Sequence, residues 1–206
     1  GTMIRAIAIE PGRRSSPAVS LLHSQEGNLF SDVPPTQWYY HDVDQVVAQG
    51  LMTTENQAFF PERAATRREV AVALYRLAGG PEAVGEFSVP DVAAGDPAYA
   101  AIRWAVERHI LTGFEDGTVR PEASVTREQL AALLFRARGE RPLSGPSQMR
   151  LYLFDDWESI QGYAWDAMGW AVYSGLLKGV SAQTLAPGGT VTRAQLASIL
   201  LRVQAL

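Results

Sequence analysis

The stretch Thr192-Arg193-Ala194-Gln195-Leu196 decides how this chain is organised. It recurs as Thr126-Arg127-Glu128-Gln129-Leu130 and as Thr66-Arg67-Arg68-Glu69-Val70, so the three threonines stand at intervals of 60 and 66 residues. In each copy a proline lies five residues before the threonine, and an arginine lies ten residues after it. A pattern that returns at such intervals is typical of a repeat protein, in which each copy is one structural unit.

Each copy of this pattern predicts the start of an α-helix. A threonine at the N-cap accepts a hydrogen bond from the backbone N–H three residues later, and a Glu or Gln at that later position reaches back to the N-cap N–H. Glu69, Gln129 and Gln195 hold this position. Apolar residues then follow at helical spacing, as from Leu130 to Leu134. We therefore predict three capped helices.

A shorter helix is predicted upstream of each capped helix. Apolar residues follow a stagger of three to four positions in three segments, which begin near Trp38, Tyr99 and Tyr163. The expected cap of the first is Asp32 or Thr36. Gly50 stands where a glycine commonly ends a helix. Each unit is therefore a helix, a loop and a capped helix.

The predicted fold is mainly α, with three helix-loop-helix units packed as a pseudo-threefold cluster. Two short helices bury too little apolar surface to be stable alone, so the units must pack on one another. With three copies, a closed cluster is favoured over an open solenoid. Residues 1–28 are predicted to be a lead or linker, with a short strand over Ile4–Glu10; the remnant of a preceding domain is the alternative. The units are expected over residues 29–79, 87–139 and 151–206.

Composition excludes several classes of protein. The net charge is −4 and the isoelectric point is near 5.4, so no surplus of Lys and Arg favours a nucleic-acid partner. The chain has no cysteine, which excludes disulfides, thiolate metal sites and thiol nucleophiles. No apolar run approaches the ~20 residues that span a bilayer, so no membrane insertion is expected.

No enzyme activity is predicted. An active site needs a nucleophile or an acid–base set in one pocket. His23, His41 and His109 lie in three unrelated sequence contexts, and none recurs between the units. No phosphate-binding glycine loop or zinc motif is present. We therefore predict no catalytic residues, no metal and no cofactor.

The combined pattern resembles the S-layer homology (SLH) domain over about residues 29–206, in three copies. Each unit opens with Phe-x-Asp-Val or a close variant and ends with Thr-Arg and a capped helix. The second and third copies also share Trp-Ala-Val in the first helix and a valine before the Thr-Arg pair. The resemblance implies a pseudo-threefold helical spindle, located outside the cell, that anchors a surface protein non-covalently to the bacterial cell wall. It implies as partner a secondary cell-wall polysaccharide, often carrying a pyruvate ketal on N-acetylmannosamine, bound in grooves between adjacent units.

The resemblance also implies which residues bind the polymer. The arginine of each Thr-Arg pair binds the acidic sugar, helped by the opening aspartate, an aromatic position and glycines that let the backbone approach a ligand. In the third unit the aspartate is Asp155 or Asp156, of which we take Asp155. The other roles open to these residues are ion pairs between units for the arginines, helix capping for the aspartates and packing for the aromatic rings. The predicted ligand residues are Arg67, Arg127, Arg193, Asp32, Asp91, Asp155, Trp38, Tyr163, Gly113 and Gly179.

A physical argument supports the arginines. Each lies in the first turn of a helix, where free N–H groups and the positive end of the dipole favour an anion. A guanidinium also fits a carboxylate bidentately. Thr53 stands where the other units have a loop glycine, and Pro97 replaces the aromatic residue in the second unit. The ligand prediction therefore rests more on Arg127 and Arg193, whose own units keep the glycine, than on Arg67.

A second class of function remains open. The repeats could form a self-assembly or protein-interaction module without glycan binding, with other copies in a surface array as partners. An anchor for an acidic polymer needs exposed, unpaired arginines, whereas a purely structural repeat would bury them in ion pairs. If Arg127 and Arg193 bind the polymer, replacing either with alanine should weaken binding and leave the melting temperature nearly unchanged.

Overall fold

The computed structural model describes residues 2–6, 19–23, 30–82, 88–141 and 145–206, and it is mainly α-helical as predicted. The expected first residues of units one and two, Leu29 and Phe87, lie outside this range. Three short 3₁₀ helices, η1 to η3, precede the third unit's first helix. The helices are α1 (Tyr40–Ala48), α2 (Arg67–Leu77), α3 (Tyr99–Glu107), α4 (Arg127–Ala137), α5 (Pro146–Met149), η1 (Leu151–Leu153), η2 (Trp157–Ser159), η3 (Gly162–Ala164), α6 (Trp165–Tyr173) and α7 (Arg193–Gln204).

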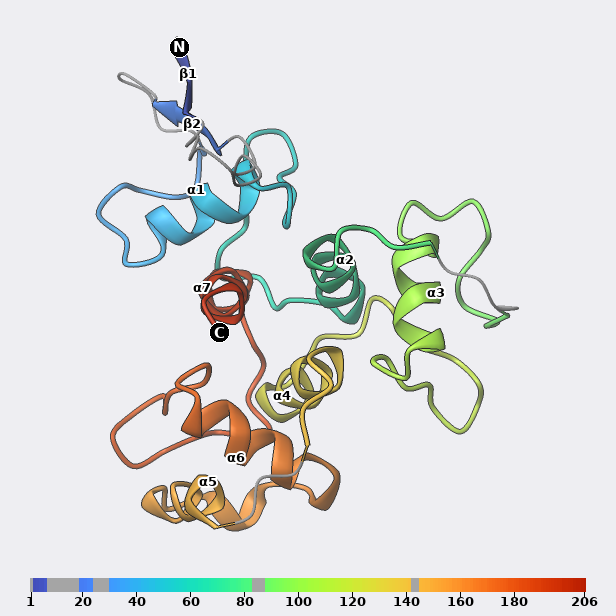
Figure 1. The fold of residues 1–206 in the computed structure, drawn as a ribbon, viewed down its shortest axis with the longest axis vertical. Helices are drawn as coiled ribbons and strands as arrows, with labels where there is room; N and C mark the ends of the chain where they lie inside the picture. The colour runs from blue at the N-terminus through green and yellow to red at the C-terminus, as the bar shows by residue number, and fades with distance from the viewer. Residues whose placement is uncertain (1, 7–18, 24–29, 83–87, 142–144) are drawn as a thin grey trace, which may run out of the picture.

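The three capped helices α2, α4 and α7 form the centre, and α1, α3 and α6 lie around them (Figure 1). Each outer helix packs against the central helix of the preceding unit: α3 on α2, α6 on α4, and α1 on α7. The packing therefore crosses every unit boundary, and the last unit closes on the first. This arrangement is the closed cluster expected from three copies.

A ring of backbone hydrogen bonds closes the cluster where the central helices begin. The N–H of Ala65 donates to Val191 O (2.8 Å), Val191 N–H donates to Val125 O (3.0 Å), and Val125 N–H donates to Ala65 O (3.0 Å). All three residues are buried. Each unit thus contributes one donor and one acceptor, and three short segments satisfy each other's backbone groups away from water.

The capping boxes are confirmed in all three units. Thr66, Thr126 and Thr192 are the N-caps, and in each case both hydrogen bonds of the box are present. The prediction that Asp32 or Thr36 caps the first helix is wrong, because α1 starts from Tyr39 without a side-chain cap.

The outer helices end close to where they were predicted to end; α3 also starts at Tyr99 as predicted, whereas α1 and α6 start later than expected. Gly50 and Gly175 follow α1 and α6 with φ of +70° and +76°, the left-handed conformation in which glycine is favoured. His109 takes the same place after α3 with φ of +55°. Tyr163 was expected inside the third unit's first helix; it lies instead in η3, one short turn before α6.

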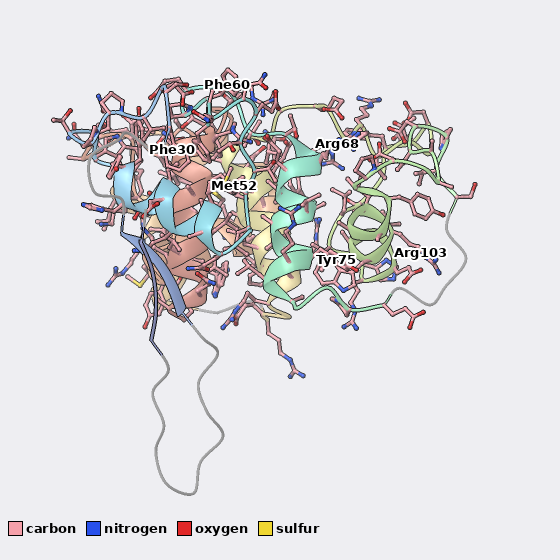
Figure 2. The ribbon with its side chains drawn as sticks, turned by 90° about the horizontal axis from the view of Figure 1, so that it is seen from above. Phe30, Met52, Phe60, Arg68, Tyr75 and Arg103 are labelled. Carbon is pink, nitrogen blue, oxygen red and sulfur yellow. The ribbon has the colours of Figure 1, made fainter. Side chains whose placement is uncertain are left out.

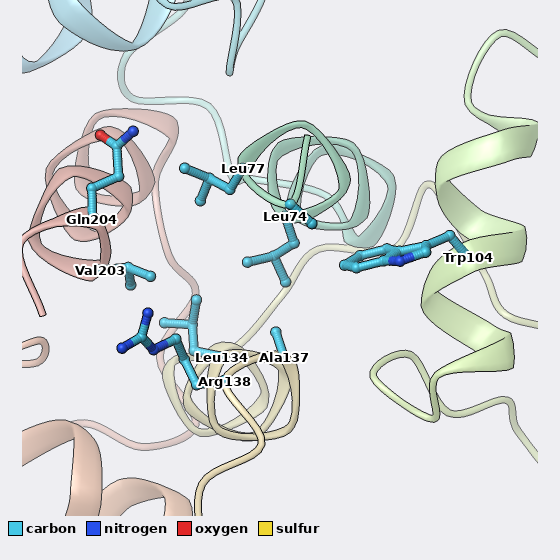
Figure 3. A pocket seen from close by; sticks show the side chains of 9 residues that line it. Leu74, Leu77, Trp104, Leu134, Ala137, Arg138, Val203 and Gln204 are labelled. Atoms are coloured by element: carbon cyan, nitrogen blue, oxygen red, sulfur yellow. The ribbon is translucent and has the colours of Figure 1, made fainter. Parts of the chain in front are cut away.

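Apolar side chains fill the space between the helices. Trp104 and Trp170, at equivalent positions of α3 and α6, are buried against Tyr75 and Phe135 of the preceding unit, with ring centroids 5.7 Å apart in both pairs. A cavity of about 420 Å³ lies where the three central helices end (Figure 3). Its lining is mostly apolar: Leu74, Leu77, Ala78, Trp104, Leu134, Ala137, Arg138, Val203 and Gln204.

Two segments outside the repeats carry structure of their own. In the lead, β1 (Thr2–Ala6) pairs antiparallel with β2 (Val19–His23). The strand predicted over Ile4–Glu10 therefore starts earlier, and residues 7–10 lie outside the described part. The polar stretch between the second and third units contains α5, which packs on α6.

We expect Thr126→Ala to lower the free energy of unfolding by about 1 kcal/mol, because an alanine N-cap leaves the N–H of Gln129 without its acceptor. Thr36→Ala is the matched control: Thr36 is exposed and caps no helix. Urea unfolding followed by circular dichroism measures both variants. An unchanged midpoint for Thr126→Ala would contradict a stabilising role for the cap.

Candidate functional site

The three repeat arginines reach across the unit boundaries. Arg67, Arg127 and Arg193 are only 3–6% exposed. In each, Nε and Nη2 donate to two backbone carbonyls of a loop in the neighbouring unit. The acceptors are Val119 O (2.7 Å) and Thr112 O (2.7 Å) for Arg67, Leu185 O (2.8 Å) and Lys178 O for Arg127, and Phe59 O (2.7 Å) and Thr53 O (2.6 Å) for Arg193.

The N–H groups at the starts of the central helices are not free for an anion. In the second unit, Arg127 N–H donates to Gly189 O (2.9 Å) and Glu128 N–H to Pro187 O (3.0 Å), while Gln129 N–H donates to the Thr126 hydroxyl (3.2 Å). The other two units repeat these bonds. The expectation that open helix N-termini help to bind an anion is therefore wrong, because the packing of the units uses these donors.

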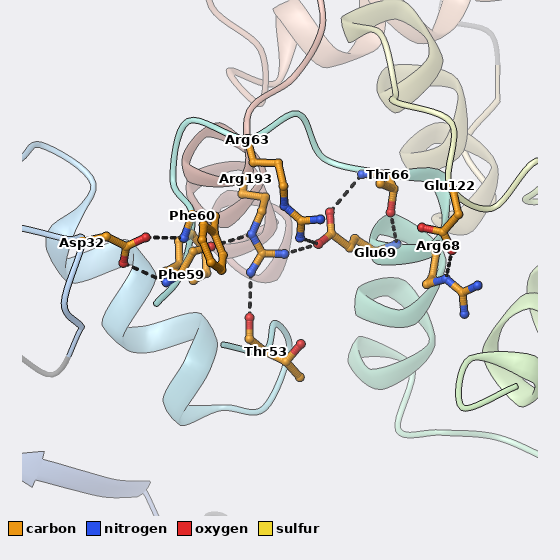
Figure 4. Close-up of polar contacts among 10 residues, drawn as sticks. All are labelled: Asp32, Thr53, Phe59, Phe60, Arg63, Thr66, Arg68, Glu69, Glu122 and Arg193. Atoms are coloured by element: carbon orange, nitrogen blue, oxygen red, sulfur yellow. Dashed lines mark hydrogen bonds and ion pairs between the residues drawn. The ribbon is translucent and has the colours of Figure 1, made fainter. Parts of the chain in front are cut away.

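The remaining guanidinium nitrogen, Nη1, distinguishes the three arginines. Nη1 of Arg193 donates to the carboxylate of Glu69 (Figure 4). For Arg67 and Arg127, no residue in the described part of the chain accepts from Nη1. There, the indole nitrogen of Trp104 is the one buried side-chain polar atom without a partner. Nη1 of Arg67 and of Arg127 therefore keeps contact with solvent.

Arg67 and Arg127 match neither the exposed, unpaired arginines expected of an anchor nor the buried ion pairs expected of a purely structural repeat, whereas Arg193 matches the second. Burial lowers the pKa of all three guanidinium groups. They nonetheless stay charged near neutral pH, since the ordinary pKa of arginine lies so far above it. Arg67 and Arg127 are buried without a carboxylate partner, and their charge is held by backbone carbonyls with one edge left open. Arg193 is buried in an ion pair.

Each arginine lies in one of three equivalent grooves, which we name after the residue that completes the capping box. The Glu69 groove (about 340 Å³) is lined by Leu51, Met52, Thr53, Arg68, Glu69, Val72, Arg76, Pro97, Ala98 and Arg193. The Gln129 groove (about 300 Å³) is lined by Arg67, Thr112, Gly113, Phe114, Gln129, Ala132, Leu133, Arg136 and Tyr163. The Gln195 groove (about 290 Å³) is lined by Trp38, Arg127, Leu176, Leu177, Lys178, Gly179, Val180, Gln195, Ser198, Ile199 and Arg202.

All three units contribute to every groove. One unit supplies the loop and one face of its central helix, the preceding unit supplies the buried arginine, and the following unit supplies the residue at the aromatic position. Each groove runs along a central helix, from the capping-box residue in its first turn to the arginine in its last turn. Figure 2 shows Phe60 and Arg68 toward the end where the central helices begin and Tyr75 toward the other.

A second arginine lines each groove, and no ligand-binding role was predicted for it from the sequence. These are Arg76, Arg136 and Arg202, which stand ten residues after the capping threonines. Arg136 and Arg202 are half-buried and donate to Ile110 O (3.3 Å) and Leu176 O (3.0 Å). Their regular recurrence was the signal that could have identified them.

The two predicted aromatic residues lie in different grooves and are well exposed. Trp38 is 63% exposed in the Gln195 groove, and Tyr163 is 54% exposed in the Gln129 groove. The Tyr163 hydroxyl donates to Glu128 Oε1 (3.1 Å), which fixes the ring at the groove edge. Partial burial and the Glu128 carboxylate raise the pKa of Tyr163 to about 12, so the tyrosine stays neutral. Pro97 takes the corresponding place in the Glu69 groove.

The opening aspartates do not line the grooves. Asp32 accepts hydrogen bonds from the N–H groups of Phe59 (2.8 Å) and Phe60 (2.6 Å), and Asp91 accepts from Val119 and Arg120 in the same way. In the third unit it is Asp156, and not Asp155, that accepts from Leu185 (2.8 Å) and Ala186 (2.7 Å). Asp32, Asp91 and Asp156 therefore hold the loop that leads to the central helix and do not cap the first helix. A ligand contact of the opening aspartates stays a prediction.

This loop-holding role predicts that replacing Asp156 and replacing its neighbour Asp155 will change the free energy of unfolding by very different amounts. Asp156→Ala should lower the free energy of unfolding by about 2–3 kcal/mol, because two loop N–H groups lose a charged acceptor. Asp155 is exposed, so Asp155→Ala should change it by about 0.5 kcal/mol or less. Chemical denaturation measures both; equal effects would contradict the assignment of Asp156 to the structural position.

The loop glycines are required by the loops themselves. A Cβ at Gly179 would lie 2.3 Å from Ser181 O and 2.6 Å from the Phe154 ring, and a Cβ at Gly113 would lie 3.2 Å from Thr118 O. Both glycines also line their grooves. Tight loop packing therefore accounts for them, and a role in ligand approach stays a prediction.

The two positions at which one unit differs from the others in its loop glycine or its aromatic residue line the same groove. Thr53, Pro97 and the paired arginine, Arg193, all lie in the Glu69 groove. Arg193 was ranked above Arg67 as a ligand because the third unit keeps its loop glycine. The premise of that ranking is wrong, because each arginine contacts the loop of the next unit: Arg67 donates to Thr112 O beside Gly113, and Arg193 donates to Thr53 O.

Within the described ranges, no group of three or more His, Cys, Asp or Glu side chains is placed to hold a metal ion. In the same part of the chain, no helix has both the length and the apolar character needed to cross a bilayer.

Comparison with known proteins identifies the family. The family model of the S-layer homology domain matches residues 90–131 and 153–197. The chain therefore contains two copies of this domain, which lie in the second and third units. The first unit repeats their capping box, cross-boundary arginine and loop-holding aspartate.

Similar proteins include much longer ones. An endoglucanase from Bacillus sp. (strain KSM-635) is 32% identical over 83% of this chain and 18% of its own length. A cellulosome-anchoring protein from Acetivibrio thermocellus is 27% identical over 70% of this chain and 33% of its own length. The S-layer protein EA1 of Bacillus anthracis is 32% identical over 59% of this chain and 13% of its own length. The chain therefore spans a third or less of each of these relatives.

Proposed function

We propose that this chain anchors a larger protein non-covalently to the bacterial cell surface by binding an acidic secondary cell-wall polysaccharide. The polymer's pyruvate ketal on N-acetylmannosamine supplies the carboxylate, and the grooves between the units receive it. We assign residues 29–79 as a third S-layer homology repeat beside the two matched ones. The chain is a binding module and not an enzyme, and its location is extracellular, at the cell wall.

The observation that carries this proposal is the open edge of Arg67 and Arg127. In each, two nitrogens are held by loop carbonyls, and the third faces a groove with no acceptor among the described residues. A fixed guanidinium with one free edge suits a carboxylate, and the low exposure limits screening by water. A second arginine and an exposed aromatic ring line the same groove, as a charged sugar requires.

The local charge of these grooves differs from that of the whole chain. The chain carries −4, yet the described residues that line the Gln129 and Gln195 grooves include two and three basic side chains and no acidic one. The positive electrostatic potential of these residues favours an anionic ligand in the Gln129 and Gln195 grooves, while the negative net charge gives the chain no general affinity for polyanions. Relatives named as a cellulosome-anchoring protein and an S-layer protein support the same function.

Sedimentation with purified wall sacculi tests the proposal. The chain should pellet with intact sacculi and stay in the supernatant after the secondary polymer has been stripped chemically. Raised salt should reduce the bound fraction, because the contact is between charges. Equal pelleting before and after stripping would overturn the polysaccharide as ligand and favour the alternative, a module that binds proteins or other copies of itself.

A further inference from the structure

The capping-box residue of the first unit, Glu69, lies where a ligand carboxylate would lie in the other two grooves. Its Oε1 accepts from Arg193 Nη1 and from Arg63 Nη2 (2.6 Å), and its Oε2 accepts from Thr66 N–H (2.9 Å) (Figure 4). Glu69 thus accepts from Nη1 of Arg193, and the equivalent nitrogen of Arg67 and of Arg127 has no acceptor among the described residues. Glu69 thus completes the helix cap and neutralises the groove arginine with one carboxylate.

We propose that Glu69 closes the first of the three grooves to anionic sugars, so that the chain binds its acidic ligand in the Gln129 and Gln195 grooves alone. This inference rests on the proposed function. An incoming carboxylate would have to displace Glu69 from Arg193 and would meet a like charge at contact distance. Glutamine completes the cap equally well in the other two units and leaves the arginine's free edge open.

Two independent features of the same groove agree with this inference. Pro97 supplies no aromatic face on which a sugar ring could stack, whereas Tyr163 and Trp38 do so in the other grooves. Arg68, which also lines the Glu69 groove, is itself paired with Asp96 and Glu122. Of the three basic side chains in the Glu69 groove, Arg68 and Arg193 are therefore paired with acidic residues, whereas Arg76 donates to Gly50 O (2.8 Å).

Exchanging the capping-box residues tests the inference in both directions. Glu69→Gln should open the first groove, and Gln129→Glu should close the second by pairing with Arg67. Both exchanges are nearly isosteric, and each residue already completes a cap elsewhere in the chain, so the helices should persist. Gln195→Glu provides the same test for the third groove, through Arg127.

The readout is the backbone amide spectrum of the full chain, titrated with a glycoside of pyruvylated N-acetylmannosamine. The amides of Thr53, Gly113 and Gly179 report on the Glu69, Gln129 and Gln195 grooves. In the unmodified chain, Gly113 and Gly179 should shift and Thr53 should not. Thr53 should begin to shift in Glu69→Gln, and Gly113 should cease to shift in Gln129→Glu, while Gly179 responds in both. The dispersed spectrum shows that each variant is folded.

The outcomes separate the two proposals. A shift of Thr53 in the unmodified chain, or a silent Thr53 in Glu69→Gln while Gly179 still responds, would overturn the role of Glu69 and leave the proposed function standing. No shift at Gly113 and Gly179 in the unmodified chain would overturn the proposed function, and the inference with it.

Discussion

Arg127→Ala is expected to destabilise the protein by about 3–5 kcal/mol, because it leaves two loop carbonyls, one of them buried, without a donor and opens a cavity at the boundary between units. The carbonyls belong to Leu185 and Lys178, in a different unit from the arginine. The side chain therefore helps to close the cluster. This revises the sequence-based expectation that the melting temperature would hardly change.

Thermal and urea unfolding measure this effect, with Arg138→Ala as the matched control. Arg138 belongs to the same unit, follows α4 and is exposed, so its removal should change stability by about 0.5 kcal/mol or less. Equal melting temperatures for Arg127→Ala and the unmodified chain would contradict the structural role of the arginine. Loss of wall binding in Arg127→Ala alone would not identify a ligand contact, because partial unfolding would produce it as well.

The double variant Gln129→Glu with Gln195→Glu is expected to reduce binding to wall polysaccharide at least ~10-fold and to leave the fold intact. Each new carboxylate should pair with a groove arginine, as Glu69 does with Arg193. It would then accept the hydrogen bond from Nη1 that is otherwise available to the ligand. Loss of one good charge-assisted contact per groove corresponds to about 1.5–3 kcal/mol, which is tenfold or more in affinity.

The control for this variant adds the same charge elsewhere. Gln183 and Gln204 are exposed and line none of the three grooves, so Gln183→Glu with Gln204→Glu changes the net charge equally. Calorimetric titration with purified polysaccharide compares the two double variants. The same loss of affinity in both would show that overall charge governs binding, and would contradict the assignment of the ligand to the grooves.

Much of the fold follows from local sequence signals. The capping boxes at Thr66, Thr126 and Thr192 gave the starts of all three central helices, because a cap is specified within four residues. Their regular recurrence predicted the closed cluster. The starts of α1 and α6 were placed too early, since their N-caps, Tyr39 and Ala164, make no side-chain hydrogen bond that would mark them in the sequence. The start of α3 at Tyr99 was predicted from its apolar spacing.

The site was predicted in composition but not in geometry. The arginines and the aromatic positions do line grooves, yet the partner of each depends on how the units pack, which no local pattern encodes. For this reason Arg193 was grouped with its own loop, although it contacts Thr53 from another unit. Asp32, Asp91 and Asp156 hold loops some 27 to 30 residues away, and such a contact leaves no signature in local spacing.

The most direct test of the central claim is the affinity of the chain for isolated wall polysaccharide before and after mild acid removes its pyruvate ketals. If the grooves bind an acidic sugar through Arg67 and Arg127, the intact polymer should bind in a salt-dependent manner and the depyruvylated polymer should bind at least ~10-fold more weakly. Equal affinity for the two polymers would contradict the claim.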